Sequence, residues 1–392
     1  MKVLLVAWAI YDSRIESFCG NCTGAGLVIK NLCEYIGKTE QSYLYVGQYD
    51  IEDIKLGNIN IVSNVLENDA GRFNARVDRV IWKFEKILKE LKPDIVNVHG
   101  IGEMAIRCIY ICKRNKIPCV FVEHLYIGLN KTFQKYDRDV EWEKELYNIS
   151  NLNIVTVSTG MKKKILNDYS RLNPENLTVV RNGTDFSAKL MESDLRTKYS
   201  VQNKKVLLCV GNITERKNQL QLIDSYKLLP EYVRDEVAIF FCGIDRINGK
   251  LEERINKENL QNELIYVGAV SNDEMKKFYS IADGLIMPSL AEGLSIAALE
   301  AIAYGLPVIM SAKLECADDL SDENVSVLAK TQESSSIAEA ITTWFNKKWD
   351  RKYIMKCASN FTMENMAEQY IELNKKIIEN ERYDCEHHMS TV

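Results

Sequence analysis

Apolar runs of strand length alternate with amphipathic stretches of helical periodicity along the chain. The strand runs are continuously apolar, a pattern typical of parallel sheets that helices cover on both faces. We predict strands at residues 2–9, 42–46, 95–99, 119–123, 154–158, 177–180, 206–211, 237–242, 264–267, 284–287 and 308–310. We predict helices at residues 26–35, 79–91, 103–115, 219–227, 272–281 and 295–304. This alternation predicts an α/β protein built from right-handed crossover units.

The alternation breaks near Arg181, where the turn signal Asn182-Gly183 and a polar stretch precede a new strand. The length of 392 residues also exceeds what one hydrophobic core usually organises. We therefore predict two doubly wound, Rossmann-like domains and a C-terminal helix, at residues 1–182, 183–362 and 363–380, with a frayed tail at 381–392. Ligands of such sheets bind beyond the carboxyl ends of the strands, so the two domains are expected to face each other across a ligand-binding cleft.

Composition and charge exclude several classes of protein. The chain is 46% hydrophobic and 27% charged, which is typical of a globular protein, and its net charge of −5 argues against a nucleic-acid-binding protein. It has 11 cysteines, but the CxxC pair Cys19 and Cys22 lacks a second pair or a nearby histidine to complete a zinc site. Scattered cysteines of this kind indicate reduced thiols and a cytoplasmic location.

Membrane insertion is not expected from the sequence. The N-terminal run MKVLLVAWAI has one lysine and no small-residue cleavage site, so it is predicted to be a buried strand and not a signal peptide. The longest apolar region, 285–310, contains Glu292, Glu300 and Pro307, which argues against a transmembrane helix. The lysine run 162–164 is consistent with peripheral contact at the inner face of a membrane, although such a run is more often a solvated helix face.

The predicted helix 295–304 is apolar all round except for Glu300. An apolar helix is a buried helix, and a buried carboxylate costs several kcal/mol unless a polar group meets it. No cation lies within one helical turn. A diol such as a ribose is a suitable partner, because its two hydroxyls can donate to the two carboxylate oxygens. The alternative is that Glu300 pairs with a distant arginine or lysine.

The start of this helix forms a candidate anion site. Gly293, Leu294, Ser295 and Ile296 offer backbone N–H groups at the positive end of the helix dipole. Glu292 precedes them and is expected to point into the cleft and accept hydrogen bonds from sugar hydroxyls. One strand–loop–helix unit would then hold a sugar, a diphosphate and a ribose in that order.

A second candidate anion site follows the predicted strand 206–211. Arg216 and Lys217 lie at a strand-to-helix junction, where two adjacent cations can make charge-assisted contacts to a phosphate. An exposed Arg-Lys pair at a helix start is also commonplace, so the position opposite the Glu292–Glu300 segment is what favours phosphate binding.

These residues resemble those of the retaining family-4 glycosyltransferases of GT-B fold. The pair Glu292 and Glu300, spaced as Glu-x7-Glu, lies in PSLAEGLSIAALEAIAYGLPVIMS, which is similar to the family's signature segment. Other similar segments are DIVNVHG, which contains His99, VFVEH, which ends at His124, VSTGMKKKIL, the turn Asn182–Asp185, and VGAVSNDEMKKFYSIADG. The segment FTMENMAEQYIELNKKI resembles the family's last helix, which crosses back onto the first domain.

The resemblance implies a hexosyltransferase. Such an enzyme moves a hexose or N-acetylhexosamine from a nucleotide-diphosphate sugar to a glycan or lipid-linked acceptor, retaining the anomeric configuration and using no metal or other cofactor. A UDP-sugar is favoured as donor and a GDP-sugar is the alternative. The resemblance also implies a role in polysaccharide biosynthesis.

The resemblance also assigns roles to individual residues. Lys217, Glu292 and His124 would be catalytic, and Glu300, Gly268 and Val270 would bind the nucleoside. The diphosphate would be bound by Arg216, Lys217, Asn212, Gly24, Gly293, Leu294, Ser295 and Ile296. His99 and Tyr126 would lie on the acceptor side, as would parts of the stretch 127–147.

Three positions depart from the family pattern. Asn212 stands where the family often has arginine, so part of the stabilisation of the leaving group is expected to come from Arg216. Ser295 replaces a common glycine, which a helix start tolerates. Gly24-Ala25 replaces paired glycines after a long insert at 11–23, and this insert is expected to determine acceptor specificity.

Several mechanisms and functions stay open on the sequence. In a front-side attack the departing phosphate takes the proton of the acceptor and Lys217 stabilises its charge, whereas Glu292 as a covalent nucleophile is the alternative. A histidine at a strand end, such as His124, faces the ligand side, but it could also be a hydrogen-bonded core residue. Because of Asn212, a non-catalytic sugar-nucleotide-binding partner subunit is an alternative function. An NAD-dependent oxidoreductase is a remote one, since Gly24-Ala25-Gly26 lacks the third glycine of the dinucleotide fingerprint.

Overall fold

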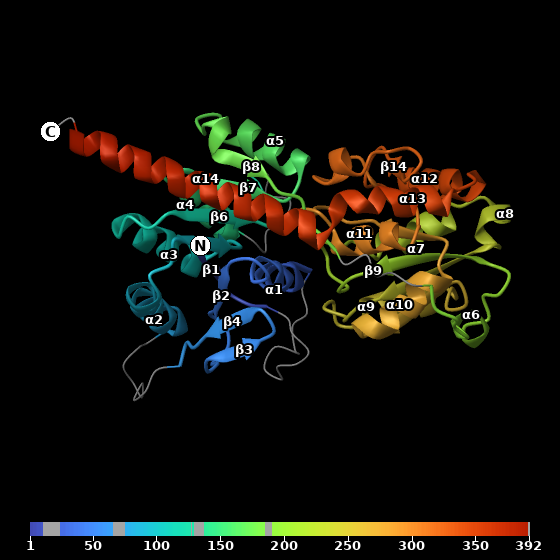
Figure 1. Ribbon diagram of the computed structural model, residues 1–392. Helices are drawn as coiled ribbons and strands as arrows, with labels where there is room; N and C mark the ends of the chain where they lie inside the picture. Colours follow the sequence, from blue (N-terminus) through green and yellow to red (C-terminus); the bar gives the residue numbers. More distant parts are fainter. Residues whose placement is uncertain (11–23, 66–74, 127, 129–136, 185–189, 391–392) are drawn as a thin grey trace. The chain divides into compact units, whose positions relative to one another are not determined.

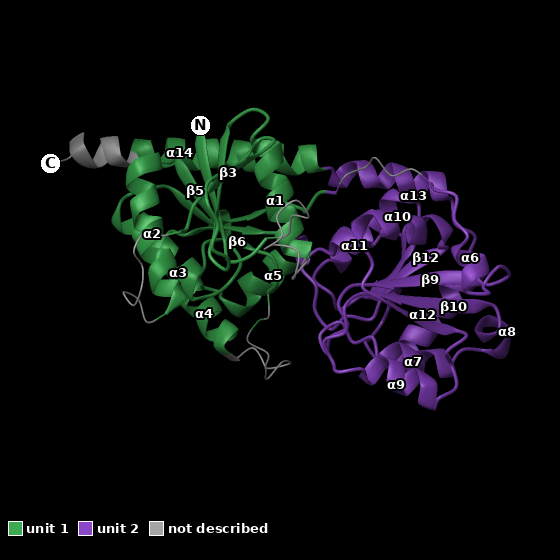
Figure 2. Ribbon diagram, turned by 90° about the horizontal axis from the view of Figure 1, so that it is seen from below, with its two compact units in different colours: residues 1–157, 161–183, 363–392 green, residues 158–160, 184–362 purple. Residues whose placement is uncertain are grey.

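The computed structural model describes residues 1–10, 24–65, 75–126, 128, 137–184 and 190–390, with 384–390 described by their backbone alone. The chain forms two units (Figure 2). Unit 1 comprises Met1–Val157, Met161–Gly183 and Met363–Val392, and unit 2 comprises Ser158–Gly160 and Thr184–Thr362. The chain therefore changes unit at Gly183, one residue from the sequence-based boundary, and the C-terminal helix is part of unit 1.

Unit 1 contains an eight-stranded sheet in the order β3-β4-β2-β1-β5-β6-β7-β8. Its neighbouring strands are parallel except β3 and β4. The strands are β1 (Lys2–Ala7), β2 (Gln41–Val46), β3 (Ile54–Leu56), β4 (Ile59–Val62), β5 (Ile95–His99), β6 (Cys119–Glu123), β7 (Asn153–Thr156) and β8 (Leu177–Val179). The register pairs Ala7 with His99 and His99 with Val122, so the carboxyl ends of β1, β5 and β6 lie side by side.

Helices flank the sheet of unit 1 on both sides (Figures 1 and 2). They are α1 (Gly24–Ile36), α2 (Arg76–Leu91), α3 (Glu103–Arg114), α4 (Asp137–Tyr147), α5 (Thr159–Asp168) and α14 (Met363–Ser390). α14 packs against α1, and α3 packs against both α2 and α4. Helical structure in α14 continues to Ser390, beyond the expected end at residue 380, because the chain from 381 to 390 contains no glycine or proline to stop it.

Unit 2 contains a parallel six-stranded sheet in the order β11-β10-β9-β12-β13-β14. Its strands are β9 (Lys205–Val210), β10 (Val237–Cys242), β11 (Leu264–Gly268), β12 (Gly284–Met287), β13 (Val308–Ser311) and β14 (Ser326–Ala329). Its helices are α6 (Leu195–Lys198), α7 (Gln221–Lys227), α8 (Glu231–Arg234), α9 (Lys250–Lys257), α10 (Asn272–Ile281), α11 (Ile296–Ala303), α12 (Ser334–Asn346) and α13 (Arg351–Cys357). The two parallel-sheet units confirm the predicted α/β fold class.

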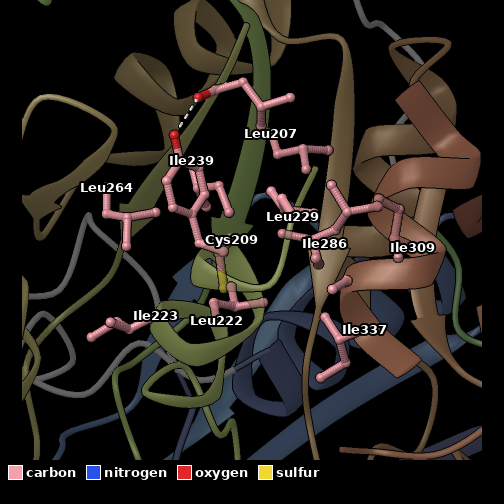
Figure 3. Packing of buried hydrophobic residues seen from close by; sticks show 14 of the residues in the cluster. Leu207, Cys209, Leu222, Ile223, Leu229, Ile239, Leu264, Ile286, Ile309 and Ile337 are labelled. Carbon is pink, nitrogen blue, oxygen red and sulfur yellow. Dashed lines mark hydrogen bonds between the residues drawn. The ribbon is translucent and has the colours of Figure 1, made fainter. Parts of the chain in front are cut away.

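The core of unit 2 explains why its strands read as unbroken apolar runs. Leu207, Ile239 and Ile286 come from three neighbouring strands and are at most 1% exposed. They pack with residues of α7 and α12, among them Leu222 and Ile337 (Figure 3). Because a helix layer covers this face of the sheet, alternation with polar residues would bury unpaired polar groups.

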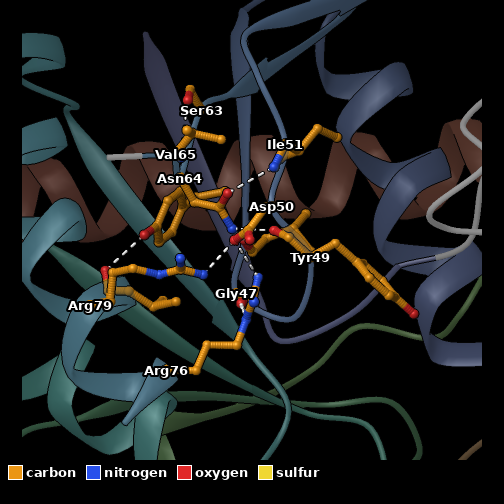
Figure 4. Close-up of polar contacts among 12 residues, drawn as sticks. Gly47, Tyr49, Asp50, Ile51, Ser63, Asn64, Val65, Arg76 and Arg79 are labelled. Carbon is orange, nitrogen blue, oxygen red and sulfur yellow. Dashed lines mark hydrogen bonds and ion pairs between the residues drawn. The ribbon is translucent and has the colours of Figure 1, made fainter. Parts of the chain in front are cut away.

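A polar network fixes the loop after β2 in unit 1 (Figure 4). The buried Asn64 accepts a hydrogen bond from the backbone N–H of Ile51 at 2.9 Å and donates to the carbonyl of Val46 at 2.7 Å. Arg76 donates to the carbonyl of Gly47 at 2.8 Å and pairs with Asp50 at 2.9 Å. These contacts hold the loop after β2 in one backbone conformation, although the loop forms no helix or strand.

The described residues bear on two predictions, that the cysteines are reduced and that no helix spans a membrane. The cysteines whose side chains are described are free thiols, nearly all buried, and Cys19 and Cys22 lie outside the described residues. No helix in the described part of the chain is both long and apolar enough to span a bilayer.

Candidate functional site

The candidate site in unit 2 is built on the carboxyl ends of β9 and β12. After β12, the loop residues Ala291, Glu292 and Leu294 are buried, and Ser295 is the N-cap of α11 with an extended backbone. The helix therefore begins where the sequence predicted, at the carboxyl end of a central strand. Its N-terminal dipole is positive there, as an anion site requires.

The predicted residues Arg216, Lys217 and Glu292 come together at this edge. The Lys217 ammonium lies 2.6 Å from Oε1 of Glu292, and the Arg216 guanidinium lies 3.1 Å from the same oxygen. Arg216 also donates to the carbonyl of Ala291 at 2.6 Å, and its own carbonyl accepts from the N–H of Leu290 at 2.8 Å. The segment after β9 is thereby tied to the loop after β12.

Glu292 is ionised in this arrangement. Burial alone would raise the pKa of its carboxyl, but Lys217 and Arg216 outweigh burial and hold the pKa below its ordinary value. The side chain is only 8% exposed, against 18% for Lys217 and 23% for Arg216. Glu292, which was expected to point into the cleft and accept from sugar hydroxyls, is here a buried anion between two more exposed cations.

Two glycines make room for Lys217. Gly211 follows β9 with a φ of +134°, and a Cβ at this position would lie 3.3 Å from Cε of Lys217. Gly243 follows β10, and a Cβ there would lie 2.0 Å from the carbonyl oxygen of Gly211. The two backbones therefore touch beneath the lysine, and neither position accommodates a larger residue without movement.

Asn212 contributes through its backbone. Its carbonyl accepts a hydrogen bond at 3.0 Å from the amide of Gln219, whose side-chain oxygen accepts from the N–H of Thr214 at 3.2 Å. These bonds shape the turn that carries Arg216 and Lys217. With asparagine in place of arginine at position 212, the cations of this turn are Arg216 and Lys217.

Glu300 meets a tyrosine that the sequence reading had not identified. The Tyr279 hydroxyl, from α10, donates to Oε2 of Glu300 at 2.7 Å. Burial raises the pKa of Glu300, and the hydrogen bond from Tyr279 opposes this rise. Among the described residues no arginine or lysine forms an ion pair with Glu300, so the alternative of an internal cation is excluded for them.

The surroundings of Glu300 leave it open to a ligand. The residue is only partly buried, and within the described part of the chain Tyr279 is its one side-chain hydrogen-bond donor. Tyr279 stacks on Tyr304, with ring centroids 5.3 Å apart. Gly268 ends β11 with a φ of +85° and open space around its Cα, and Val270 lies two residues further on, before the helix cap Ser271.

In unit 1, His99 and His124 form a pair. Nδ1 of His99 lies 3.1 Å from Nε2 of His124, and the rings are stacked with centroids 5.3 Å apart. Burial and the neighbouring His124 lower the pKa of His99 well below its ordinary value, and burial lowers the pKa of His124 to about 4. Both rings are therefore neutral at pH 7, with His99 buried and His124 partly buried.

Two other residues of unit 1 that were predicted to belong to the site differ in their exposure to solvent. Tyr126 is fully buried and its hydroxyl donates to Asp168 at 2.7 Å, so in this structure it packs inside the unit and presents no surface to an acceptor. Gly24 is exposed and is the first residue of α1. The insert 11–23 and most of 127–136 lie outside the described residues, as does Asp185 of the predicted turn.

Sequence reasoning missed two polar residues of the unit 2 site. Tyr279 faces Glu300 because α10 packs beside α11, a tertiary contact that periodicity alone does not reveal. The buried Glu315 accepts from the N–H of Glu292 at 3.1 Å. Within the described residues no group of three His, Cys, Asp or Glu side chains is arranged to hold a metal ion.

Curated relatives match part of the chain. An uncharacterized glycosyltransferase of Methanocaldococcus jannaschii is 25% identical over 239 residues, 58% of this chain and 60% of that protein. An Escherichia coli enzyme named UDP-Gal:alpha-D-GlcNAc-diphosphoundecaprenol alpha-1,3-galactosyltransferase is 25% identical over 238 residues, 58% of this chain and 59% of that protein. The chain thus spans about three-fifths of the length of these relatives.

Structural and family comparisons cover more of the chain. The crystal structure of Anabaena HepE in complex with UDP has a TM-score of 0.71 and 16% identity, and the match covers 96% of this chain and 100% of that one. The family described as Glycosyltransferase Family 4 matches residues 23–188, and the family described as Glycosyl transferases group 1 matches residues 192–361. With both matches in sequence order on two Rossmann-like units, the chain belongs to the family-4, group 1 glycosyltransferases of GT-B fold.

Proposed function

We propose that the chain is a retaining hexosyltransferase. It moves a hexose or N-acetylhexosamine from a nucleotide-diphosphate sugar to a glycan or lipid-linked acceptor. The observation that carries this proposal is the arrangement of three side chains in unit 2. Lys217 and Arg216 lie at the carboxyl ends of one parallel sheet, together with the carboxylate of Glu300, which pairs with no cation among the described residues. Phosphates and vicinal hydroxyls are the complementary groups for these two features.

The diphosphate is assigned to Lys217 and Arg216. Both cations are more exposed than the carboxylate that pairs with them, so a phosphate oxygen can approach from the solvent side without displacing Glu292. Two fixed cations, one charge of which Glu292 offsets, leave a net positive charge to meet the diphosphate, which supports metal-independent transfer. The start of α11, residues 293–296, adds its dipole to the same region.

The ribose is assigned to Glu300. Tyr279 occupies one lone pair of Oε2, and two hydroxyls of a ribose can donate to the remaining lone pairs of the carboxylate. The base is assigned to the backbone near Gly268 and Val270. A UDP-sugar is favoured because the E. coli relative is named for UDP-galactose and the HepE structure contains UDP. A GDP-sugar is the second donor to test.

Front-side transfer fits the environment of Glu292 better than a covalent intermediate. A nucleophilic carboxylate must reach the anomeric carbon, whereas Glu292 is nearly buried and shared by two cations. Its role in this proposal is to position Lys217 and Arg216 for the leaving phosphate. His124 is neutral at pH 7 and can therefore accept or donate a hydrogen bond to a sugar hydroxyl.

The acceptor is assigned to unit 1 and to a lipid-linked or free glycan. The name of the E. coli relative includes a diphosphoundecaprenol acceptor, which supports a role in polysaccharide assembly at the inner face of a membrane. Lys162 contributes little to membrane contact in this proposal, because its ammonium donates to the carbonyls of Pro174 and Leu177. His99 is retained as the second histidine of this unit.

The direct test is release of nucleoside diphosphate from a panel of UDP-, GDP- and ADP-sugars, with and without glycan acceptors. The expected result is sugar-specific turnover by the wild type and its loss in Lys217→Met. Tight binding of a sugar nucleotide without turnover, with every acceptor class supplied, would instead assign the chain as a non-catalytic binding subunit.

A further inference from the structure

Two buried asparagines in unit 1 have side chains without protein partners. Asn97 of β5 and Asn374 of α14 are both 0% exposed, and neither their amide oxygens nor their amide nitrogens have a hydrogen-bond partner among the described residues. An unpaired buried amide is strongly unfavourable, and native proteins nearly always satisfy such groups. Two of them in one layer therefore require a shared explanation.

Two contacts of α14, one on each side of Asn374, indicate that this residue lies near Asn97. The ring of Tyr370 lies 6.3 Å from the ring of His99, at the carboxyl end of β5. Lys375 pairs at 3.3 Å with Glu40, whose carboxylate also binds the N-terminal amine at the opposite end of the sheet. α14 therefore runs antiparallel to β5. Asn374 follows Tyr370 by four residues on the helix, a rise of about 6 Å. Asn97 precedes His99 by two residues on the strand, also a distance of about 6 Å.

The same face of the sheet carries His99 and Asn97, because side chains two residues apart on a strand point the same way. The inner ring nitrogen of the pair, Nε2 of His99, is buried and lacks a protein partner. The strand neighbours of Asn97 on this face are Leu5 and Val120, both apolar and fully buried. The neighbouring strands therefore offer the Asn97 amide no polar side chain on this face.

The spacing suits water better than direct contact. The Cβ atoms of residues two apart on a strand are separated by about 6.6 Å, whereas two hydrogen bonds of about 2.8 Å through one water span at most about 5.6 Å. One water can therefore join the Asn97 amide to the His99 ring where the two side chains lean toward each other. Buried waters typically bridge about three otherwise unpaired polar groups. Asn97, Asn374 and His99 Nε2 are three such groups.

We propose that Asn97 and Asn374 form a buried water-binding site between β5 and α14 that supplies the inner hydrogen-bond partner of His99 and so fixes the orientation of the His99–His124 pair. Asn97 and Asn374 are then positioning residues, acting on His124 through His99. The C-terminal helix is thereby linked to the histidine pair. This inference goes beyond the proposed transferase function, and its structural part does not depend on it.

The test combines high-resolution crystallography with ¹⁵N NMR of the histidine side chains. In the wild type we expect an ordered water bound to Asn97, Asn374 and His99 Nε2. In Asn97→Leu and Asn374→Leu, which keep the branching and the number of heavy atoms of the side chain but remove its polar groups, we expect the water to be lost and the ¹⁵N resonances of His99 and His124 to shift. Asn374→Ser replaces the amide with a hydroxyl that can still bind water, so it is expected to retain both the water and the wild-type resonances. It serves if a leucine variant fails to fold.

Val98→Ala is the matched control. Val98 also lies in β5 and is fully buried, but it points to the other face of the sheet. The control is expected to lower stability and leave the histidine resonances unchanged. Histidine resonances that are unchanged in both leucine variants, or that shift equally in Val98→Ala, would overturn the proposal. A protein without transferase activity but with the water and these shifts would reject the proposed function and leave this inference standing.

Discussion

One oxygen of Glu292 binds the Lys217 ammonium at 2.6 Å. Arg216 shares that oxygen, so a single buried carboxylate positions two cations at the carboxyl end of a parallel sheet. Breaking such a pair leaves an uncompensated buried charge, whereas a phosphate that joins it adds a second anion to two cations. This relationship determines what substitutions at these positions should do.

Comparing Lys217→Met with the double variant Lys217→Met, Glu292→Gln should separate catalysis from stability. We expect turnover to fall about a hundredfold or more, because one fixed donor to the leaving phosphate is lost. Stability should also fall, since Glu292 keeps Arg216 as its only cation. The double variant Lys217→Met, Glu292→Gln should recover stability in urea unfolding but not turnover. Near-wild-type turnover in Lys217→Met would remove the lysine from the mechanism.

Tyr279→Phe should weaken nucleotide binding. The tyrosine hydroxyl stabilises the charged form of Glu300, so its removal raises the pKa of that carboxyl further and reduces the fraction able to accept from a ribose. Binding measured by calorimetry should weaken more at about pH 6 than at about pH 8.

Tyr304→Phe is the control for this change. Tyr304 stacks on Tyr279 but no hydrogen bond joins its hydroxyl to Glu300 in the described structure. If Tyr304→Phe weakened binding as much as Tyr279→Phe, ring packing and not the hydrogen bond would explain the effect.

Gly243→Ala should destabilise unit 2 and disturb the Lys217 turn. The new methyl would meet the carbonyl of Gly211, a backbone atom that cannot rotate away. Overpacking of this kind typically lowers the free energy of unfolding by about 1–3 kcal/mol. Gly249→Ala is the comparison, because open space surrounds its Cα and only its φ of +79° opposes the change. Equal stability of the two variants would show that the close approach does not persist in solution.

The histidine pair predicts a specific pH dependence of stability. Both folded-state pKa values lie below the ordinary value of 6.5, so the unfolded chain takes up protons first as the pH falls. The free energy of unfolding should therefore decrease from about pH 7 toward pH 4, where folded His124 itself becomes protonated. The slope should be at most about 1.4 kcal/mol per pH unit for each histidine.

His124→Asn isolates this contribution. Urea unfolding at about pH 7, 6 and 5 should show a shallower decrease for the variant than for the wild type. Parallel curves for the two proteins would mean that other groups account for the loss of stability in acid.

The sequence predicted most of the sheets because their strands are buried on both faces. Ile95–His99, Cys119–Glu123, Val237–Cys242 and Gly284–Met287 were predicted with their observed bounds. The strands β3, β4 and β14 were missed because they are both short and only partly buried, so they form no continuous apolar run. The equally short β12 was found because all of its residues are buried.

The chemistry of the site was less accessible from sequence. Glu300 in an apolar helix identified the need for a polar partner, but the partner Tyr279 comes from another helix. The burial of Glu292 between two cations depends on how two loops fold over each other. The insert 11–23 and most of residues 127–136, the first part of the stretch 127–147 that was assigned to the acceptor side, lie outside the described residues, so those assignments stay predictions.

The central claim is that Glu300 binds the hydroxyls of a ribose. It is tested most directly by calorimetric titration of the wild type and Glu300→Gln with UDP and GDP and with their 2′,3′-dideoxy analogues. We expect the wild type to bind the preferred nucleotide about tenfold or more tightly than its dideoxy analogue, because each hydroxyl donates to a charged group, and we expect Glu300→Gln to lose most of this difference. A wild type that binds nucleotide and dideoxy analogue equally well would contradict the claim.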